Sequence, residues 1–167
     1  MKKVLYLGTD PSYYKAKGGQ IIHYPVIQIV PRMDSDIQAA YSKLANYTHL
    51  LFTSKNTVQV FFQQLNDLGI SKNLLEPIII IAIGQVTASY VKKYADCFFV
   101  VEEETQEGIV AFLRTQSLEK THFFFPRSSL SRNVIINFFQ KNYILFQDCF
   151  IYDTITQKKQ PIPNLED

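Results

Sequence analysis

An apolar run that stops abruptly decides the fold of this chain: residues 50–58 read Leu-Leu-Phe-Thr-Ser-Lys-Asn-Thr-Val. A helical spacing of apolar residues follows at once, with Val58, Phe61, Phe62 and Leu65. A short apolar run, then hydroxyl residues, then a period near 3.6 predicts a buried strand that feeds a helix. Ser54 or Asn56 would cap that helix, and the unpaired N–H groups of its first turn would suit a carboxylate or phosphate. The simpler interpretation, in which these polar residues only cap the helix, also fits this stretch.

The same alternation of strand and helix continues along the chain. Strands are predicted at residues 48–52, 78–83, 97–101, 122–125 and 144–151. Amphipathic helices are predicted at residues 37–45, 57–68, 86–94, 107–116 and 129–141. Apolar strands separated by amphipathic helices are typical of a doubly wound α/β fold, with a parallel five-stranded sheet and helices on both of its faces.

Residues 1–31 lie outside this alternation. Their apolar residues predict a strand at 4–8 and a longer one at 21–30, which Pro25 interrupts. Two strands without the rest of a sheet predict an incomplete second unit, and their open edges predict a homodimer through these strands. We therefore divide the chain into N-terminal strands and linker at 1–31, an α/β domain at 32–152, and a tail or return linker at 153–167.

Composition is typical of a globular protein with a packed core. The 167 residues include 13 Phe and 10 Tyr, and 47% are apolar. The net charge is +2 and the Lys and Arg residues are scattered, which argues against a nucleic-acid partner. No apolar stretch approaches the roughly 20 residues that cross a bilayer, and the start lacks the pattern of a cleavage site. Because Cys97 and Cys149 lie in apolar runs typical of reduced thiols, we expect a cytoplasmic protein with no membrane partner.

Ligands of such sheets bind beyond the carboxyl ends of the strands. The candidate residues at those ends are Thr53, Ser54, Lys55, Asn56, Gly84, Thr87, Arg127, Ser128 and Tyr152. The sequence contains no glycine-rich dinucleotide turn and no P-loop, and its three histidines lack metal-ligand spacing. Hydroxyls, helix starts and a few cations favour a ligand with several carboxylates and an enzyme that mainly positions a reactive substrate. The alternative is that these hydroxyls only cap helices and that the cations are solvated.

Several of these stretches resemble the uroporphyrinogen-III synthase family. Residues 52–58, Phe-Thr-Ser-Lys-Asn-Thr-Val, are similar to the family's Phe-Thr-Ser-x-Asn-x-Val stretch, and residues 81–88 to its apolar-Gly-x-x-Thr-Ala turn. Further blocks that resemble the family are Thr-Gln-Glu-Gly-Ile at 105–109, Phe-Pro-Arg at 125–127, Ile-Tyr-Asp-Thr at 151–154 and the linker at 24–31. These blocks stand in the family's order and spacing.

The resemblance implies two flavodoxin-like α/β domains joined by a two-stranded linker. It implies that the linear tetrapyrrole hydroxymethylbilane is cyclised to uroporphyrinogen III, with inversion of the last ring, loss of water and a spiro intermediate. It also implies that no metal or cofactor takes part. Tyr152 would assist loss of the hydroxyl, with Ser54 and Thr87 in the same site. The substrate's acetate and propionate groups fit the anion-friendly strand ends.

The chain departs from the family in two places. Thr9-Asp10-Pro11 stands where the family has Thr-Arg-Pro, and the segment before Tyr24 is too short for the family's first helix. The part after Thr154 is also shorter than in the family, so we expect the C-terminal part of the first domain to be lacking. The alternative function is a non-catalytic α/β module that binds a tetrapyrrole or a protein partner. Flavin or nucleotide binding by analogy of fold is disfavoured, because the sequence has no phosphate loop.

Overall fold

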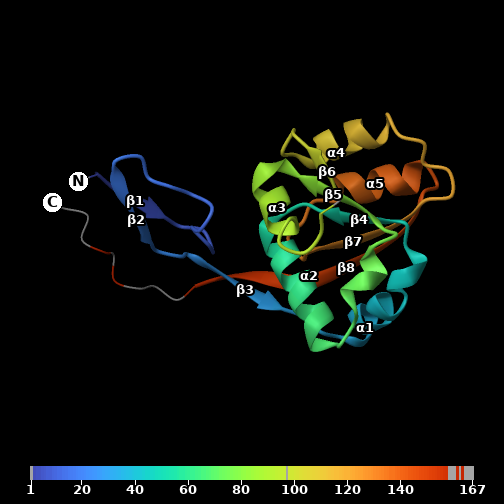
Figure 1. The fold of residues 1–167 in the computed structure, drawn as a ribbon, viewed down its shortest axis with the longest axis horizontal. Helices are drawn as coiled ribbons and strands as arrows, with labels where there is room; N and C mark the ends of the chain where they lie inside the picture. Colours follow the sequence, from blue (N-terminus) through green and yellow to red (C-terminus); the bar gives the residue numbers. More distant parts are fainter. Residues whose placement is uncertain (1, 97, 158–160, 162, 164–167) are drawn as a thin grey trace. The chain divides into compact units, whose positions relative to one another are not determined.

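The computed structural model describes residues 2–96, 98–157, 161 and 163 (Figure 1). It has two compact units, one of residues 31–152 and one that contains residues 2–30 and the described residues from Asp153 onward. The strands are β1 (Lys2–Tyr6), β2 (Gly19–His23), β3 (Ile27–Pro31), β4 (His49–Phe52), β5 (Ile79–Ile83), β6 (Phe98–Val101), β7 (His122–Ser128) and β8 (Leu145–Thr156). The α-helices are α1 (Ser35–Ser42), α2 (Lys55–Asp67), α3 (Gly84–Val91), α4 (Gln106–Leu113) and α5 (Val134–Lys141), and short 3-10 turns cover Leu44–Asn46 and Lys72–Leu75.

The larger sheet has the strand order β3-β8-β7-β4-β5-β6. The five strands β8, β7, β4, β5 and β6 pair in parallel, which confirms the predicted doubly wound sheet. Counted along the chain from β4, the order across the sheet is 5-4-1-2-3, whereas the flavodoxin-like order is 2-1-3-4-5, so that finer detail of the prediction is not matched. Both orders have a switch point, where the chain reverses its direction across the sheet; here it lies between β4 and β7.

Helices cover both faces of this sheet because successive side chains of a buried strand point to opposite sides. In β7, Phe124 has its ring centroid 5.8 Å from that of Tyr41 on α1 and 6.2 Å from that of Phe61 on α2. Phe123 instead lies 4.7 Å from Phe139 on α5. Figure 1 shows α4 and α5 on one face and α1, α2 and α3 on the other. Neighbouring phenylalanines of β7 therefore pack into two separate hydrophobic cores, one on each face of the sheet.

Two predicted boundaries around β7 are wrong. The strand does not end at Pro126: it continues to Ser128, and Pro126 pairs with Cys149 of β8. β4 pairs with β7 at Phe123 and Phe124, so the proline falls beyond that pairing, where its missing N–H breaks no ladder bond. The predicted helix at 129–141 starts later, at Val134, and residues 129–133 form a loop in which Leu130 is 72% exposed.

The last strand is also longer than predicted, because β3 lies beside it. Backbone bonds of 2.9 Å from the Arg32 N–H to the Ile151 carbonyl and from the Gln157 N–H to the Val26 carbonyl run antiparallel. This partner carries β8 past Tyr152 to Thr156. No described helix is long and apolar enough to cross a membrane.

The N-terminal strands differ from the prediction in their bounds. The predicted strand at 21–30 is two strands, β2 and β3, which belong to different sheets, and Pro25 lies between them. β1 and β2 form a two-stranded parallel sheet, from Lys2 beside Gly19 to Tyr6 beside His23. The pairing of these strands between two copies of the chain stays a prediction. Cys97, the first residue of a predicted strand, lies outside the described residues.

Candidate functional site

A pocket of about 300 Å³ lies beyond the carboxyl end of β4, at the switch point. β4 and β7 pair at His49 with Phe123 and at Leu50 with Phe124, and the chain beyond these pairs lines the pocket. The lining residues are Thr53, Ser54, Ile83, Glu104, Thr105, Gln106, Ser128, Leu130, Ser131, Arg132 and Tyr152. This is the position at which open α/β sheets bind their ligands.

Three hydroxyl groups meet beside this pocket. The phenol oxygen Oη of Tyr152 lies 3.0 Å from the Ser54 Oγ and 3.5 Å from the Thr57 Oγ1, and the two smaller hydroxyls lie 2.9 Å apart. Ser54 is the N-cap of α2, since its Oγ accepts the Thr57 N–H at 3.1 Å. Tyr152 is 4% exposed and Thr57 is 1% exposed. The helix cap and the buried phenol therefore share one hydrogen-bond cluster.

A β-bulge places Tyr152 in that cluster. Arg127 pairs with Phe150 but the next residue, Ser128, pairs with Tyr152, so β8 carries one extra residue at this point. The Ser129 N–H bonds the Tyr152 carbonyl at 3.2 Å and holds the register after the shift. A bulge re-aims the side chains that follow it, which explains why Ile151 and Tyr152 are both buried although they are neighbours in a strand.

The loop of residues 128–133 forms one wall of the pocket and is held by buried side chains. The Arg127 guanidinium bonds the Ser131 carbonyl at 3.2 Å and the Asn133 Oδ1 at 2.9 Å, and its other nitrogens lie 2.9 and 2.7 Å from the Asp148 Oδ2. From the opposite side, the Gln106 side chain donates to the Ser131 Oγ at 3.1 Å. These bonds pair the Ser131 carbonyl, the Ser131 hydroxyl and the Asn133 side chain outside a helix, which favours the later start of α5.

Comparisons with known proteins point to one family. The family model for uroporphyrinogen-III synthase HemD matches residues 12–167. This chain belongs to that family. The porphyrin biosynthesis protein HemD of Ruminiclostridium josui is 24% identical over 88% of this chain and 30% of its own length.

Solved structures show the same fold. A uroporphyrinogen III synthase of the extremely thermophilic bacterium Thermus thermophilus matches with a TM-score of 0.63 and 14% identity over 94% of this chain and 63% of its own. The uroporphyrinogen-III synthetase of Helicobacter pylori 26695 matches with a TM-score of 0.56 and 16% identity over 96% of this chain and 65% of its own. The chain thus spans less than two thirds of these solved synthases and 30% of the curated relative.

Within this synthase-family fold, the structure brings together four of the residues predicted from the sequence. Thr53, Ser54, Ser128 and Tyr152 line the pocket. Gly84 opens α3 directly after the lining residue Ile83, with a positive φ of 66° and the Glu104 side chain against its Cα. These positions are compatible with the predicted binding roles, which stay predictions.

The other predicted residues do not line the pocket. Lys55 and Asn56 form the first turn of α2, and the Lys55 ammonium lies 5.8 Å from the ring centroid of Tyr90. Thr87 is 5% exposed on α3. Arg127 is 4% exposed, and its guanidinium is occupied by Asp148 and the 128–133 loop. We therefore treat Arg127 as a residue that shapes the pocket wall.

Sequence reasoning did not place Thr57, Gln106 or Glu104 in the site, and it gave Arg132 only as a cation near the strand ends. Thr57 stands three residues after Ser54, which is the spacing of a helix cap and its first bonded residue, so its closeness to the Ser54 hydroxyl was detectable. Its closeness to Tyr152 was not, because that contact depends on the bulge in β8. Arg132 lines the pocket from the loop that the helical pattern concealed, and Gln106 lines it from the first residue of α4.

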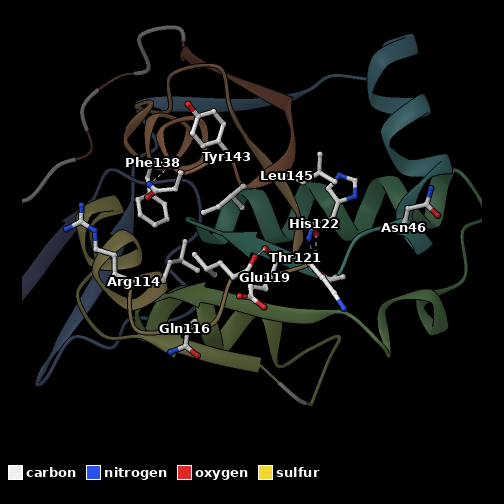
Figure 2. Close-up of a pocket in the computed structure, with 15 residues that line it drawn as sticks. Asn46, Arg114, Gln116, Glu119, Thr121, His122, Phe138, Tyr143 and Leu145 are labelled. Carbon is white, nitrogen blue, oxygen red and sulfur yellow. Dashed lines mark hydrogen bonds between the residues drawn. The ribbon is translucent and has the colours of Figure 1, made fainter.

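A larger pocket, of about 830 Å³, lies at the opposite end of the sheet, where the strands begin (Figure 2). It is lined from the amino ends of the strands, by residues such as Thr48, His122 and Leu145, and by the ends of α4 and α5. None of the residues predicted for the site lines it, and it lacks the hydroxyl cluster. We place the candidate site in the smaller pocket, because parallel sheets bind ligands at the carboxyl ends of their strands.

Burial shifts the pKa of several groups outside the site. It raises the pKa of the Cys149 thiol to about 11 and that of the Tyr47 phenol to about 12, and it lowers the pKa of His49 below its usual value. At the rim of the pocket, the bond to Arg132 lowers the pKa of the Glu107 carboxyl. Among the described residues, no group of three or more His, Cys, Asp or Glu side chains is arranged to hold a metal ion.

Proposed function

We propose that this protein acts as a uroporphyrinogen-III synthase, a lyase that cyclises hydroxymethylbilane with inversion of the last pyrrole ring and loss of water. The observation that carries the proposal is the Tyr152 phenol, held 3.0 Å from the Ser54 hydroxyl beside a pocket at the switch point. The family match over residues 12–167 gives this phenol its candidate substrate. The same match makes a non-catalytic binding module the less favoured alternative.

The hydroxyl cluster can leave the phenolic proton of Tyr152 free for the substrate. Ser54 accepts the Thr57 N–H and has its own proton to donate to the Tyr152 oxygen. Tyr152 then donates to the hydroxyl that leaves the terminal pyrrole, and the electron-rich ring expels that hydroxyl as water. Donation from Ser54 and Thr57 to the Tyr152 oxygen would stabilise the negative charge that develops on it. A positioned proton donor contributes roughly 10²–10⁴-fold to a rate.

The proposed partners of the substrate carboxylates are the start of α2 and two pocket hydroxyls. The first turn of α2, which begins at Lys55, carries the partial positive charge of a helix start and therefore favours an anion. The hydroxyls of Thr53 and Ser128 line the pocket itself. Asn56, Gly84 and Thr87 complete the set of proposed binding residues.

The size of the pocket limits how much of the substrate it can take. A volume of about 300 Å³ lies at the lower end of the range for ligand sites, so the pocket would hold one substituted pyrrole and not the whole tetrapyrrole. The rings that remain outside would extend past the pocket rim. We place this activity in the cytoplasm, in keeping with a reduced, buried Cys149.

Incubation with freshly prepared hydroxymethylbilane tests the proposal. The wild-type chain should yield mainly isomer III, whereas the spontaneous reaction yields isomer I. Tyr152→Phe should lower the rate of isomer III formation by roughly 10²–10⁴-fold, because the proton donor is lost. Tyr143→Phe is the matched control, since Tyr143 is 96% exposed at the opposite edge of the sheet. A wild-type chain that leaves the spontaneous ratio unchanged would contradict the proposed activity, and a fully active Tyr152→Phe would remove the role of the phenol.

A further inference from the structure

An exposed ion pair lies at the rim of the candidate site. The Arg132 guanidinium bonds the Glu107 carboxylate with both of its terminal nitrogens, at 2.7 and 2.8 Å. The side chains are 59% and 52% exposed, respectively. Arg132 is the one cation among the described residues that line the pocket, and Glu104 is the one anion. The geometry is the two-bonded pairing that an arginine fork forms with any carboxylate.

The pair is not needed to hold the pocket wall. The loop that carries Arg132 is fixed from below by the buried Arg127, which bonds the Ser131 carbonyl and the Asn133 side chain. It is fixed from the side by Gln106, which is 8% exposed and bonds Ser131. Solvent-exposed ion pairs add little net stability, because water competes for both partners. The Arg132–Glu107 contact can therefore open without moving the loop.

We propose that Arg132 binds an acetate or propionate group of the tetrapyrrole, and that this carboxylate displaces Glu107 from the guanidinium. The inference rests on the proposed function, which supplies a ligand with several carboxylates. Glu107 keeps the fork aligned at the rim of the pocket while the site is empty. An incoming carboxylate offers the same two acceptors, so the exchange conserves the number of charge-assisted bonds. Ligands with fewer carboxylates would gain less from Arg132, which makes it a residue that selects for carboxylate-rich tetrapyrroles.

Titration with uroporphyrin, the stable oxidised form of the product, tests this exchange by fluorescence. Arg132→Gln should raise the dissociation constant about tenfold, because a charge-assisted pair at a partly exposed site is lost. Arg132→Lys should have an intermediate effect, since it keeps the charge but not the fork. Glu107→Gln should lower the dissociation constant about threefold, because the competitor for Arg132 is weakened.

Matched controls lie at the far edge of the sheet. Arg114→Gln removes an exposed arginine near the other end of α4, and Glu119→Gln removes one exposed acid, and both residues line the larger pocket instead. Both variants should bind uroporphyrin with nearly the wild-type dissociation constant, because salt at about 0.15 M screens the loss of one distant charge. Thermal unfolding of each variant at the wild-type temperature shows that the fold is kept.

The direction in which Glu107→Gln changes the uroporphyrin dissociation constant decides between carboxylate exchange and an ion pair that stays closed. Weaker binding in Glu107→Gln would overturn the proposal, because it would mean that the pair itself shapes the site. If Arg132→Gln binds uroporphyrin as tightly as the wild-type chain, the proposed exchange is also overturned, while the proposed function stands. If the wild-type chain binds no uroporphyrin and forms no isomer III, both the proposed function and this inference fail.

Discussion

Replacing Arg127 by Met tests whether this residue shapes the pocket or binds the substrate. The sequence pattern placed Arg127 among the substrate-binding residues, whereas the structure buries it. Its side chain is 5% exposed, and its nitrogens lie 2.7 and 2.9 Å from the Asp148 Oδ2, while that aspartate side chain is 28% exposed. The same guanidinium bonds the Ser131 carbonyl and lies 4.5 Å from the ring centroid of Phe150. Met has a similar length and apolar stem, so the substitution removes the charge and the donors with little change in packing.

The expected cost follows from what is left unpaired. Removing one partner of a buried ion pair costs about 3–5 kcal/mol, because the other charge stays buried. Asp148 is partly exposed and can be rehydrated, so we expect about 2–3 kcal/mol of lost stability. For a domain of this size each kcal/mol lowers the melting temperature by about 2–4 °C, which gives a drop of about 5–10 °C. Asp148→Asn added to Arg127→Met should recover about 1 kcal/mol or more, because no unpaired carboxylate remains.

Thermal unfolding of the single and double variants, together with uroporphyrin titration, is the assay. The structural role predicts a lower melting temperature in Arg127→Met and partial recovery in the double variant. It predicts weaker uroporphyrin binding as well, because the loop that carries Ser131 is released. A variant that melts at the wild-type temperature but has lost uroporphyrin binding would refute the structural role and restore Arg127 as a direct ligand.

Three further predictions follow from other sites. Gly84→Ala should lower the melting temperature more than Gly69→Ala. Both glycines have a positive φ, 66° and 65°, which costs a residue with a side chain about 1–2 kcal/mol. A Cβ at Gly84 would also meet the Glu104 carboxylate, whereas a Cβ at Gly69 would face open space. The free energy of unfolding, measured with urea, should fall as pH rises from about 9 towards 11. The reason is that burial raises the pKa of the Cys149 thiol from 9.0 to about 11, so the unfolded chain loses that proton first. Cys149→Ala should make the free energy of unfolding less dependent on pH in this range. Tyr152→Phe should bind uroporphyrin within about threefold of the wild-type chain despite its loss of rate, since the phenol oxygen is one contact among many; a parallel loss of both would assign Tyr152 to binding alone.

The parallel sheet could be predicted from the sequence because its signals are local. Apolar runs such as Phe123-Phe124-Phe125 can be buried on both faces only in a sheet with helices on both sides, and each run is followed within a few residues by a helical period. A cap at Ser54 or Asn56 was predictable for the same reason, and the structure selects Ser54, whose Oγ accepts the N–H three residues later. The family resemblance rests on these same short stretches.

Tertiary contacts decided the remainder, because the groups involved are far apart in the sequence. The helical spacing of residues 129–141 is real, but Arg127 and Gln106 bond the polar groups of residues 131–133 and keep that segment out of the helix. The strand order depends on which strand β7 pairs with, and β3 extends β8 by lying beside it.

The hydroxyl cluster shows the division most clearly. The sequence by itself determined that a strand ends just before Ser54 and that Ser54 or Asn56 caps the helix that follows, because both depend on local pattern. It could not place the Tyr152 phenol 3.0 Å from that hydroxyl across 98 residues of chain. That distance depends on one extra residue in β8 opposite Arg127 and Ser128, and a bulge is set by how two strands pack together.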